Sequence, residues 1–443
     1  MDNSIWEFDF QKYYDLLDSQ HFTKDSGKVL EVTGLIIKAS LPGASVGSIV
    51  EVQPQGAEKN FTAEVVGFKD RNVLMMPLGP MQGVSFGSRV TLAKQVATVR
   101  IGTNILGRVI DGLGQPIDGL GAMELPLELP LYKEVRNPLA RRPIRESLDL
   151  GVRSINAGLT VGRGQRVGIM AGSGVGKSVL LGMMARYTEA DINVIALIGE
   201  RGRELREFIE EDLGPEGLKK TVIIVATSDQ GPLIRMRGAY VAMAIAEHFC
   251  AEGKNVLFMM DSVTRYAMAQ REVGLSVGEP PATKGYTPSV FSMLPKLLER
   301  AGSFEGEGSI TGLYTVLVEG DDMDDPIGDA VRSIVDGHFV LSRKLAQQGH
   351  FPALDILQSA SRVMRSVTDR HHQEMARELR EILAVHREAE DLINIGAYRP
   401  GANPKIDRAV LLIEPIIKFL RQRVEEKTNF VETLRYLQQI LHG

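Results

Sequence analysis

The run AGSGVGKS at positions 171–178 is the part of the sequence with the clearest chemistry. It follows an apolar segment, precedes VLLGMMARY, and matches the phosphate-binding pattern G-x-x-x-x-G-K-[ST], except that Ala171 replaces the first glycine. Its glycines would let backbone N–H groups approach phosphate oxygens, and Lys177 would reach the terminal phosphates of a nucleotide. The Ser178 hydroxyl could bind Mg²⁺, and the helix that begins there would add its dipole.

We therefore predict a nucleotide site whose contacts come from Gly172, Ser173, Gly174, Val175, Gly176, Lys177, Ser178 and Val179. Ala171 is expected to open the loop without weakening phosphate binding, because its backbone can still turn. The alternative is a glycine-rich turn between a strand and a helix that happens to carry a surface lysine. It is disfavoured because the motif has the strand–loop–helix context that a phosphate loop requires.

A carboxylate for the metal is expected at Asp261, which ends the apolar run NVLFMMD at 255–261. An acidic residue at the end of a strand is typical of the group that holds Mg²⁺ through a water in such sites. The alternative is a helix N-cap, because Ser262 and Thr264 follow and a helix is expected there. The phosphate loop upstream favours the metal role.

Glu200, in LIGERGRELREFIE, is the candidate for activating the attacking water, since Ser262 occupies the position where many such enzymes have their base. It follows an apolar strand, and strand ends on this edge of a doubly wound sheet face the ligand. Glu200 would orient or polarise the water, while Arg201 and Glu204 could support the shell of metal and water. The alternative is that GERGRE is simply a charged helix start, where acidic side chains are favoured.

Three sequence patterns along the chain predict the strands and helices that must position these residues. Short β-rich runs with glycine between them predict a small barrel or sandwich; they are 29–32, 34–38, 48–52, 62–68, 72–76 and 89–92. Apolar runs that alternate with helical stretches predict an α/β fold with a parallel sheet covered on both faces; they are 165–170, 192–198, 221–226, 255–260, 311–318 and 338–341. Charged helical sequence after His371, with a break at 396–404, predicts a helical bundle.

The changes from one sequence pattern to the next predict the domain boundaries. Residues 27–97 would form the barrel domain, 98–370 a linker and the nucleotide-binding domain, and 371–443 the C-terminal helical domain. The linker is inferred from a run that excludes long helices by its prolines 116, 126, 130, 138 and 143. Residues 1–26 contain the aromatic-rich IWEFDFQKYYDLL, which would either cap the barrel or dock on a partner protein.

Composition excludes several classes of protein. The 443 residues carry 51 Lys+Arg against 56 Asp+Glu, a net charge of −5, which argues against a protein that mainly neutralises phosphate backbones. A single cysteine, Cys250, excludes an intrachain disulfide and cysteine-cluster metal sites. The N-terminal MDNSIWEFDF does not have the pattern of a signal peptide, and no stretch approaches the roughly 18 apolar residues that span a bilayer. We expect a soluble intracellular protein.

The motifs together resemble one protein family. AGSGVGKS, IGERGREL and NVLFMMD are similar to the catalytic subunits of rotary ATP synthases and their hexameric relatives. So are DSVTRYAMAQREV, GEPPATKGYTPSVFSMLPKLLERAG, VEGDDMDDPIGDAVRSIVDGHFVLSR and HFPALDILQSASRVM, and the resemblance runs from about Gly27 to the C-terminus. Within that family, LLERAG and VEGDD look like the type III protein-export ATPases. The flagellar branch is favoured, and the virulence (injectisome) branch stays open.

The resemblance implies an N-terminal β-barrel, a RecA-like P-loop core and a C-terminal helical domain, assembled as a homohexameric ring. It also implies two further site residues. Arg362, in SASRVM, matches the arginine finger that reaches into the neighbouring subunit's active site; the alternative is an arginine in a surface ion pair. Phe351, before Pro352, matches the aromatic residue against which adenine packs; without the resemblance it would be assigned to the core.

The function implied by the resemblance is Mg²⁺-dependent ATP hydrolysis that energises flagellar protein export. The implied partners are export-gate, stator-like and stalk-like proteins, export substrates and chaperones, reached from the cytoplasm at the inner face of the membrane, with no nucleic acid. Alternatives are a virulence secretion ATPase, an RNA translocase of the terminator type and a rotary ATP synthase subunit. An N-terminal region with mixed charges and few aromatic residues disfavours RNA, and Glu200 disfavours a non-hydrolysing subunit.

Overall fold

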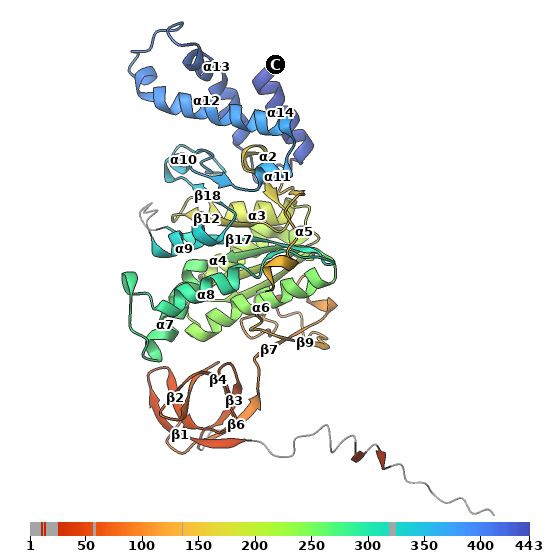
Figure 1. The fold of residues 1–443 in the computed structure, drawn as a ribbon, viewed down its shortest axis with the longest axis vertical. Helices are drawn as coiled ribbons and strands as arrows, with labels where there is room; N and C mark the ends of the chain where they lie inside the picture. Colours follow the sequence, from red (N-terminus) through yellow and green to blue (C-terminus); the bar gives the residue numbers. More distant parts are fainter. Residues whose placement is uncertain (1–9, 12, 15–24, 56–58, 135, 319–324) are drawn as a thin grey trace, which may run out of the picture. The chain divides into compact units, whose positions relative to one another are not determined.

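The computed structural model describes residues 10–11, 13–14, 25–55, 59–134, 136–318 and 325–443 (Figure 1). The chain divides into two compact units, Met1–Ala97 and Thr98–Gly443. The predicted docking or capping segment, residues 1–26, lies almost entirely outside the described residues. The predicted boundary at 370/371 falls inside the second unit and stays a prediction.

The first unit is a closed barrel of six antiparallel strands in the order β1-β2-β5-β4-β3-β6, which confirms the predicted barrel. Its strands are β1 (Ser26–Thr33), β2 (Ile36–Ser40), β3 (Ile49–Gln53), β4 (Phe61–Lys69), β5 (Asn72–Pro77) and β6 (Arg89–Lys94). The barrel closes where β1 pairs with β6. Val29, Val50 and Met75 are among the fully buried side chains that fill its interior, because alternate residues of a strand point inward.

The second unit is built on a nine-stranded sheet with the main order β19-β18-β12-β17-β15-β13-β14-β8, and β16 (Gly302–Ser303) pairs with β17. The six predicted strands are all present as β12 (Arg166–Ala171), β13 (Ile192–Ile198), β14 (Thr221–Ala226), β15 (Asn255–Asp261), β17 (Ser309–Leu317) and β18 (Gly337–Leu341). They pair in parallel. Every residue of β13 and β14 is buried, so both faces of the sheet are covered, as the apolar runs predicted.

Two details at the sheet edges differ from the sequence prediction. The segment predicted to be only a linker contributes β8 (Val109–Asp111), which extends the sheet by pairing in parallel with β14. At the other edge β19 (Ala360–Ser361) pairs antiparallel with β18, so the sheet is mixed. Strands of two or three residues are too short to give a detectable periodicity, which is why the sequence pattern missed both.

The linker is also ordered by contacts of its own. Its β7 (Thr98–Ile101) and β9 (Leu127–Pro130) form a two-stranded antiparallel sheet. Just before β8, the Arg108 guanidinium binds both carboxylate oxygens of Asp118, at 2.7 and 2.9 Å. The Val109 amide donates to the same carboxylate at 3.0 Å. The helices that the structure describes in this segment, η1 (Thr103–Ile105) and η2 (Pro138–Ala140), are short, in keeping with the prolines.

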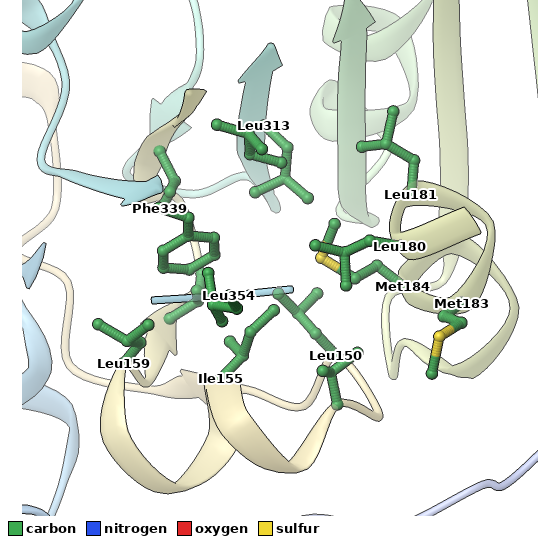
Figure 2. Packing of buried hydrophobic residues seen from close by; sticks show 14 of the residues in the cluster. Leu150, Ile155, Leu159, Leu180, Leu181, Met183, Met184, Leu313, Phe339 and Leu354 are labelled. Atoms are coloured by element: carbon green, nitrogen blue, oxygen red, sulfur yellow. The ribbon is translucent and has the colours of Figure 1, made fainter. Parts of the chain in front are cut away.

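The core of the second unit fixes the helix that follows the phosphate loop. Leu180, Leu181 and Met184 of α3 (Lys177–Tyr187) pack in one buried cluster that also contains Ile155 of α2 (Arg153–Gly158) (Figure 2). Leu313 of β17 and Phe339 of β18 belong to the same cluster. Because interiors are close-packed, this contact restrains the helix and therefore the loop before it.

The remaining helices around the sheet are α4 (Gly202–Glu207), η3 (Phe208–Leu213), α5 (Gly214–Lys219), α6 (Pro232–Ala251), α7 (Val263–Ser276), η4 (Thr283–Gly285), α8 (Pro288–Leu298), α9 (Pro326–Ile334), α10 (Arg343–Gln347) and α11 (Met364–Val367). The longest, α6, contacts β13, β14 and β15. A two-stranded pair of β10 (Ser147–Leu148) and β11 (Val161–Gly162) frames α2.

The C-terminal region is a bundle of three helices, which confirms the predicted helical domain. They are α12 (Arg370–Asn394), α13 (Pro404–Leu420) and α14 (Phe430–His442), and the predicted break lies between the first two. All three contact α2, and their buried side chains continue the core of the nucleotide-binding region. None of the helices among the described residues has the length and apolarity needed to cross a bilayer.

Candidate nucleotide site

The phosphate loop occupies the turn between β12 and α3. Gly174 and Gly176 have φ values of 76° and 82°, a backbone conformation that glycine adopts without strain. One expectation was wrong: Ala171 is the last residue of β12 and not the first of the loop. It is buried and pairs with Leu317 on one side and Leu341 on the other. A residue that pairs within a strand is extended and does not need the backbone freedom of glycine. This explains why alanine can replace the first glycine of the motif.

Lys177 joins the two carboxylates that the sequence proposed for metal and water. Its Nζ lies 2.5 Å from Asp261 Oδ1 and 3.5 Å from Glu200 Oε1. Burial lowers the pKa of Lys177, but the neighbouring Asp261 and Glu200 charges outweigh it, so the net shift is upward. Burial raises the pKa of Glu200, and the Lys177 charge offsets part of that rise. Three residues more than 20 positions apart in sequence thus form one charged cluster.

Asp261 is held at the end of β15 and is almost fully buried. The Thr315 hydroxyl, on the neighbouring β17, donates to Asp261 Oδ1 at 2.7 Å. The N-cap of α7 is Ser262, whose side chain accepts from the Arg265 amide at 3.3 Å, so the alternative cap role of Asp261 is wrong. Sequence reasoning missed Thr315, because β17 (SITGLYTVL) contains other hydroxyl side chains and Thr315 does not stand out among them.

A cavity of about 800 Å³ opens beside this cluster. Its lining includes Gly172, Ser173, Gly174, Gly176, Lys177, Ser178, Val179, Glu200, Arg201, Glu204, Arg265 and Arg343. Val175 is the one predicted loop contact that is buried and is not part of this lining. The volume is in the range of small-molecule sites, and it is large enough for a nucleoside triphosphate.

Arg201 and Glu204 lie in the wall of the cavity near its opening. Arg201 Nη1 is 3.5 Å from Glu204 Oε1, and their side chains are 67% and 43% exposed. Arg201 is the N-cap residue of α4 and Glu204 stands in its first turn. The charged helix start that we considered as an alternative is therefore present, and it also faces the cavity. Neither side chain has a described contact with Lys177 or Asp261.

Arg265 is a cavity residue that the sequence analysis did not select. It stands in the first turn of α7, four residues after Asp261, and its side chain packs against Gly199. Its Nε is buried and has no hydrogen-bond acceptor among the described residues. Burial raises the pKa of Glu200 overall, and the Arg265 charge opposes that rise. The signal that could have found it is the spacing from Asp261, because a residue in the first turn after a strand end stays near that end.

Phe351 lies beside the phosphate loop. A side chain at Gly176 would begin 3.4 Å from the Phe351 ring, which is 45% exposed. The Gln422 amide, just after α13, donates to the Phe351 carbonyl at 3.0 Å and fixes the backbone there. Phe351 is therefore not a core residue, and it lies beside the phosphate loop without being part of the cavity lining.

Replacing Phe351 by Ala is expected to weaken ATP binding about 10-fold, because removal of an aromatic ring that stacks on a base costs ~1–3 kcal/mol. The turnover number should change little, since the ring has no group that could act on the water or the metal. Titration of a fluorescent ATP analogue, with Phe351→Tyr as the variant that keeps the stack, measures this. A large fall in turnover at unchanged affinity would contradict the adenine role.

Arg362 does not line the cavity of its own chain. It follows β19 at the sheet edge, is exposed, and makes no ion pair among the described residues. Its guanidinium instead donates to the carbonyls of Val335 and Arg332, at 3.3 and 3.5 Å. The surface ion pair that we considered as its alternative role is absent from this part of the structure.

The residues present fit a magnesium ion that is held partly by the nucleotide. Among the described residues, no three His, Cys, Asp or Glu side chains are grouped as a metal site. Mg²⁺ is commonly held by one or two protein oxygens together with substrate phosphates, so few protein ligands are expected. The Ser178 hydroxyl and the Asp261 carboxylate, both hard oxygen donors, would supply them.

Comparison with known proteins identifies the family. Three family profiles match in succession: the ATP synthase alpha/beta beta-barrel domain over 29–92, the ATP synthase alpha/beta nucleotide-binding domain over 151–361, and the T3SS EscN ATPase C-terminal domain over 368–439. The chain is 50% identical over 428 residues to the flagellum-specific ATP synthase of Bacillus subtilis, covering 96% of this chain and 98% of the relative. The chain belongs to the type III protein-export ATPases of the ATP synthase alpha/beta family.

Other members of the export ATPase family agree. The type 3 secretion system ATPase of Xanthomonas euvesicatoria is 46% identical, covering 94% of this chain and 93% of the relative. The structure of the assembled ATPase EscN from enteropathogenic E. coli has a TM-score of 0.88 at 46% identity, covering 94% of this chain and all of that one. The chain is therefore an ATPase with ATP as its substrate. The flagellar assignment fits better than the virulence, RNA-translocase and rotary-synthase alternatives, because flagellar relatives match at up to 50% identity and the C-terminal profile is the export type.

Proposed function

We propose that the protein hydrolyses ATP with Mg²⁺ in a hexameric ring whose work drives flagellar protein export. The observation that carries the proposal is the cluster in which Lys177 bridges Asp261 and Glu200 at the mouth of the phosphate loop. Such a cluster supplies a cation for the phosphates, a carboxylate for the metal and a carboxylate for water within one cavity. The flagellar relatives support the process in which this hydrolysis is used.

Each residue has a separate role in the proposed reaction. The loop amides of 172–179 and Lys177 hold the triphosphate, and Phe351 holds the base. Glu200 accepts a hydrogen bond from the attacking water and orients it toward the γ-phosphorus, with its oxygen in line with the bond that breaks. Asp261, kept in place by Thr315, would hold the metal together with Ser178. Bound Mg²⁺ would neutralise charge that develops on the phosphate oxygens.

Arg201, Glu204 and Arg265 would complete the walls around the terminal phosphate. Arg265 is the better placed of the two arginines, since its Nε is buried without a protein acceptor and so could donate to a phosphate oxygen. Arg201 and Glu204, paired at the rim, would orient the outer waters of the site.

Assembly and partners are inferred from relatives. One solved relative is an assembled form of EscN, and another is EscN in complex with its central stalk EscO. By analogy this chain would form a ring that engages a stalk-like protein. Export-gate and stator-like proteins, export substrates and their chaperones would be further partners, met by a cytoplasmic protein at the inner face of the membrane. We propose no nucleic-acid partner.

Arg362→Ala tests the ring. The wild-type rate per chain should rise with protein concentration, because each site would need the arginine of its neighbour, whereas the variant should lose that rise and fall roughly 10³-fold at high concentration. Arg365→Ala, three residues later and also exposed, is the matched control and should behave like the wild type.

A mixing experiment then separates action on the neighbour from action within one chain. Arg362→Ala chains keep an intact phosphate loop, and Lys177→Ala chains keep an intact Arg362. Mixed rings should therefore regain activity that neither variant has alone. If the mixture stays as inactive as its components while both variants still assemble, the arginine does not act on a neighbouring site and the ring mechanism is wrong.

A further inference from the structure

Arg362 is held at its backbone by one residue. Its amide donates to the Asp336 carbonyl at 2.9 Å, at the point where β18 begins. The guanidinium extends from there over the end of α9, where it meets the Val335 and Arg332 carbonyls. The direction in which Arg362 leaves the sheet edge therefore depends on where Asp336 lies.

Asp336 is itself fixed by Arg166, the first residue of the strand that leads to the phosphate loop. Arg166 Nε and Nη2 lie 3.0 and 3.1 Å from the two carboxylate oxygens of Asp336. The Arg166 amide donates to the same carboxylate at 3.1 Å, and the Asp336 amide donates back to the Arg166 carbonyl at 2.8 Å. Four contacts therefore join the two residues, and their ion pair is largely shielded, with side chains 16% and 26% exposed. A two-pronged pair of this kind fixes orientation as well as distance.

Gln165 joins the same arrangement from the other side. Its side chain is fully buried, and its Nε2 donates to the Asp336 carbonyl and to the Ser361 hydroxyl, both at 3.2 Å. Its Oε1 accepts from the Gly162 amide at 2.9 Å. Gln165 thus holds the residue before Arg362 and the residue that binds Arg362. We call Gln165, Arg166 and Asp336 the Arg362 support.

We propose that the Arg362 support orients the arginine toward the nucleotide of the neighbouring subunit. The support also links Arg362 to β12, the strand that leads to the phosphate loop of its own subunit. The inference rests on the proposed trans role of Arg362. A cation that stabilises transition-state charge must be held within a fraction of an ångström of its productive position. A flexible surface arginine is not held this closely. Arg166 is the first residue of β12, and the phosphate loop follows the last residue of that strand. One rigid strand therefore connects the nucleotide site of a subunit to the arginine that would act on its neighbour.

The test is Asp336→Asn, which keeps the size and the backbone contacts but removes the charge of the ion pair. In assembled rings we expect turnover to fall about 10-fold, because small displacements of a catalytic group cost this much or more. The KM for ATP and the affinity for a fluorescent ATP analogue should not change, since no residue of the support lines the cavity. In the Arg362→Ala background, Asp336→Asn should cause no further loss, because it acts only through that arginine.

Asp118→Asn is the matched control. Asp118 likewise accepts hydrogen bonds from Nε and Nη2 of an arginine, Arg108, and from the Val109 backbone amide. It lies in the linker. It should leave turnover within a factor of two or so of the wild type, as expected for a change remote from the chemistry. If Asp336→Asn proves too unstable to purify, Arg166→Lys keeps the charge and loses the two-pronged geometry, and the same double-variant comparison applies.

Two results would overturn the inference. One is a loss from Asp336→Asn that adds to that of Arg362→Ala, or that Asp118→Asn matches, because either would mean a general loss of stability. The other is wild-type turnover in rings of both Asp336→Asn and Arg166→Lys. Failure of the proposed function looks different: Arg362→Ala alone would then retain full, concentration-dependent activity.

Discussion

Glu200→Gln is expected to reduce the turnover of ATP about 10³-fold while ATP still binds, because the amide keeps the shape of the side chain but cannot accept the proton of the attacking water. Glu200 suits this role by its position. It is 3.5 Å from Lys177, its side chain is only 20% exposed, and burial raises its pKa. The raised pKa makes the carboxylate a better proton acceptor than a surface glutamate. Phosphate release at saturating ATP measures the loss.

The control for this variant is Glu204→Gln. Glu204 lines the same cavity, but its side chain is 43% exposed and paired with Arg201 at the rim. We expect a much smaller loss there, because exposed pairs contribute little and are easily replaced by water. Substantial hydrolysis by purified Glu200→Gln would rule out Glu200 as the base. In cells, a Glu200→Gln copy expressed beside the wild type should impair flagellar export, since inactive chains would enter the rings.

Lys177→Ala is expected to abolish measurable turnover and to weaken ATP binding, with a loss of about 10²–10³-fold in rate from the missing cation alone. The structure adds a second cause. Lys177 neutralises Asp261 and Glu200 at 2.5 and 3.5 Å, and without it two buried carboxylates would face the triphosphate. Their repulsion opposes ATP binding and also favours protonation of the base. Circular dichroism should show the fold intact, because α3 is held by the core.

Two comparison variants sharpen this prediction. Lys344→Ala removes an exposed lysine of α10 that pairs with Glu390, and it should hydrolyse ATP like the wild type. Lys177→Arg keeps the charge, but its planar group cannot occupy the same position between two carboxylates, so a partial loss is expected. Equal activity of Lys177→Ala and the wild type would remove the phosphate-loop assignment and the site with it.

Much of the fold could be predicted because its strong signals are local. The run at 171–178 carries its own chemistry, and the apolar strands beside helical stretches leave few arrangements other than a covered parallel sheet. Two of the failures were also local in origin, and the third depends on distant residues. The strands β8 and β19 are too short to show a period, and Ala171 differs from a loop residue only through its ladder partners.

The site was predicted less completely, because its geometry depends on contacts between distant residues. Thr315 and Arg265 carry no motif of their own, and both belong to the site because β17 and α7 meet the end of β15. The orientation of Arg362 is a similar case, because it depends on the contact between Asp336 and Arg166, which are 170 residues apart.

The sequence by itself determined which chemical groups are available: a phosphate loop with its lysine and serine, two acids at strand ends, and the order of strands and helices. These follow from residue types and short-range spacing, which act through a few neighbouring bonds. Only the tertiary structure decided that Lys177 lies between Glu200 and Asp261, the second of which is 84 residues away in sequence. It also decided that Arg362 does not line the cavity of its own chain. Strand order in the sheet brings those groups together or keeps them apart, and packing of the whole core sets that order.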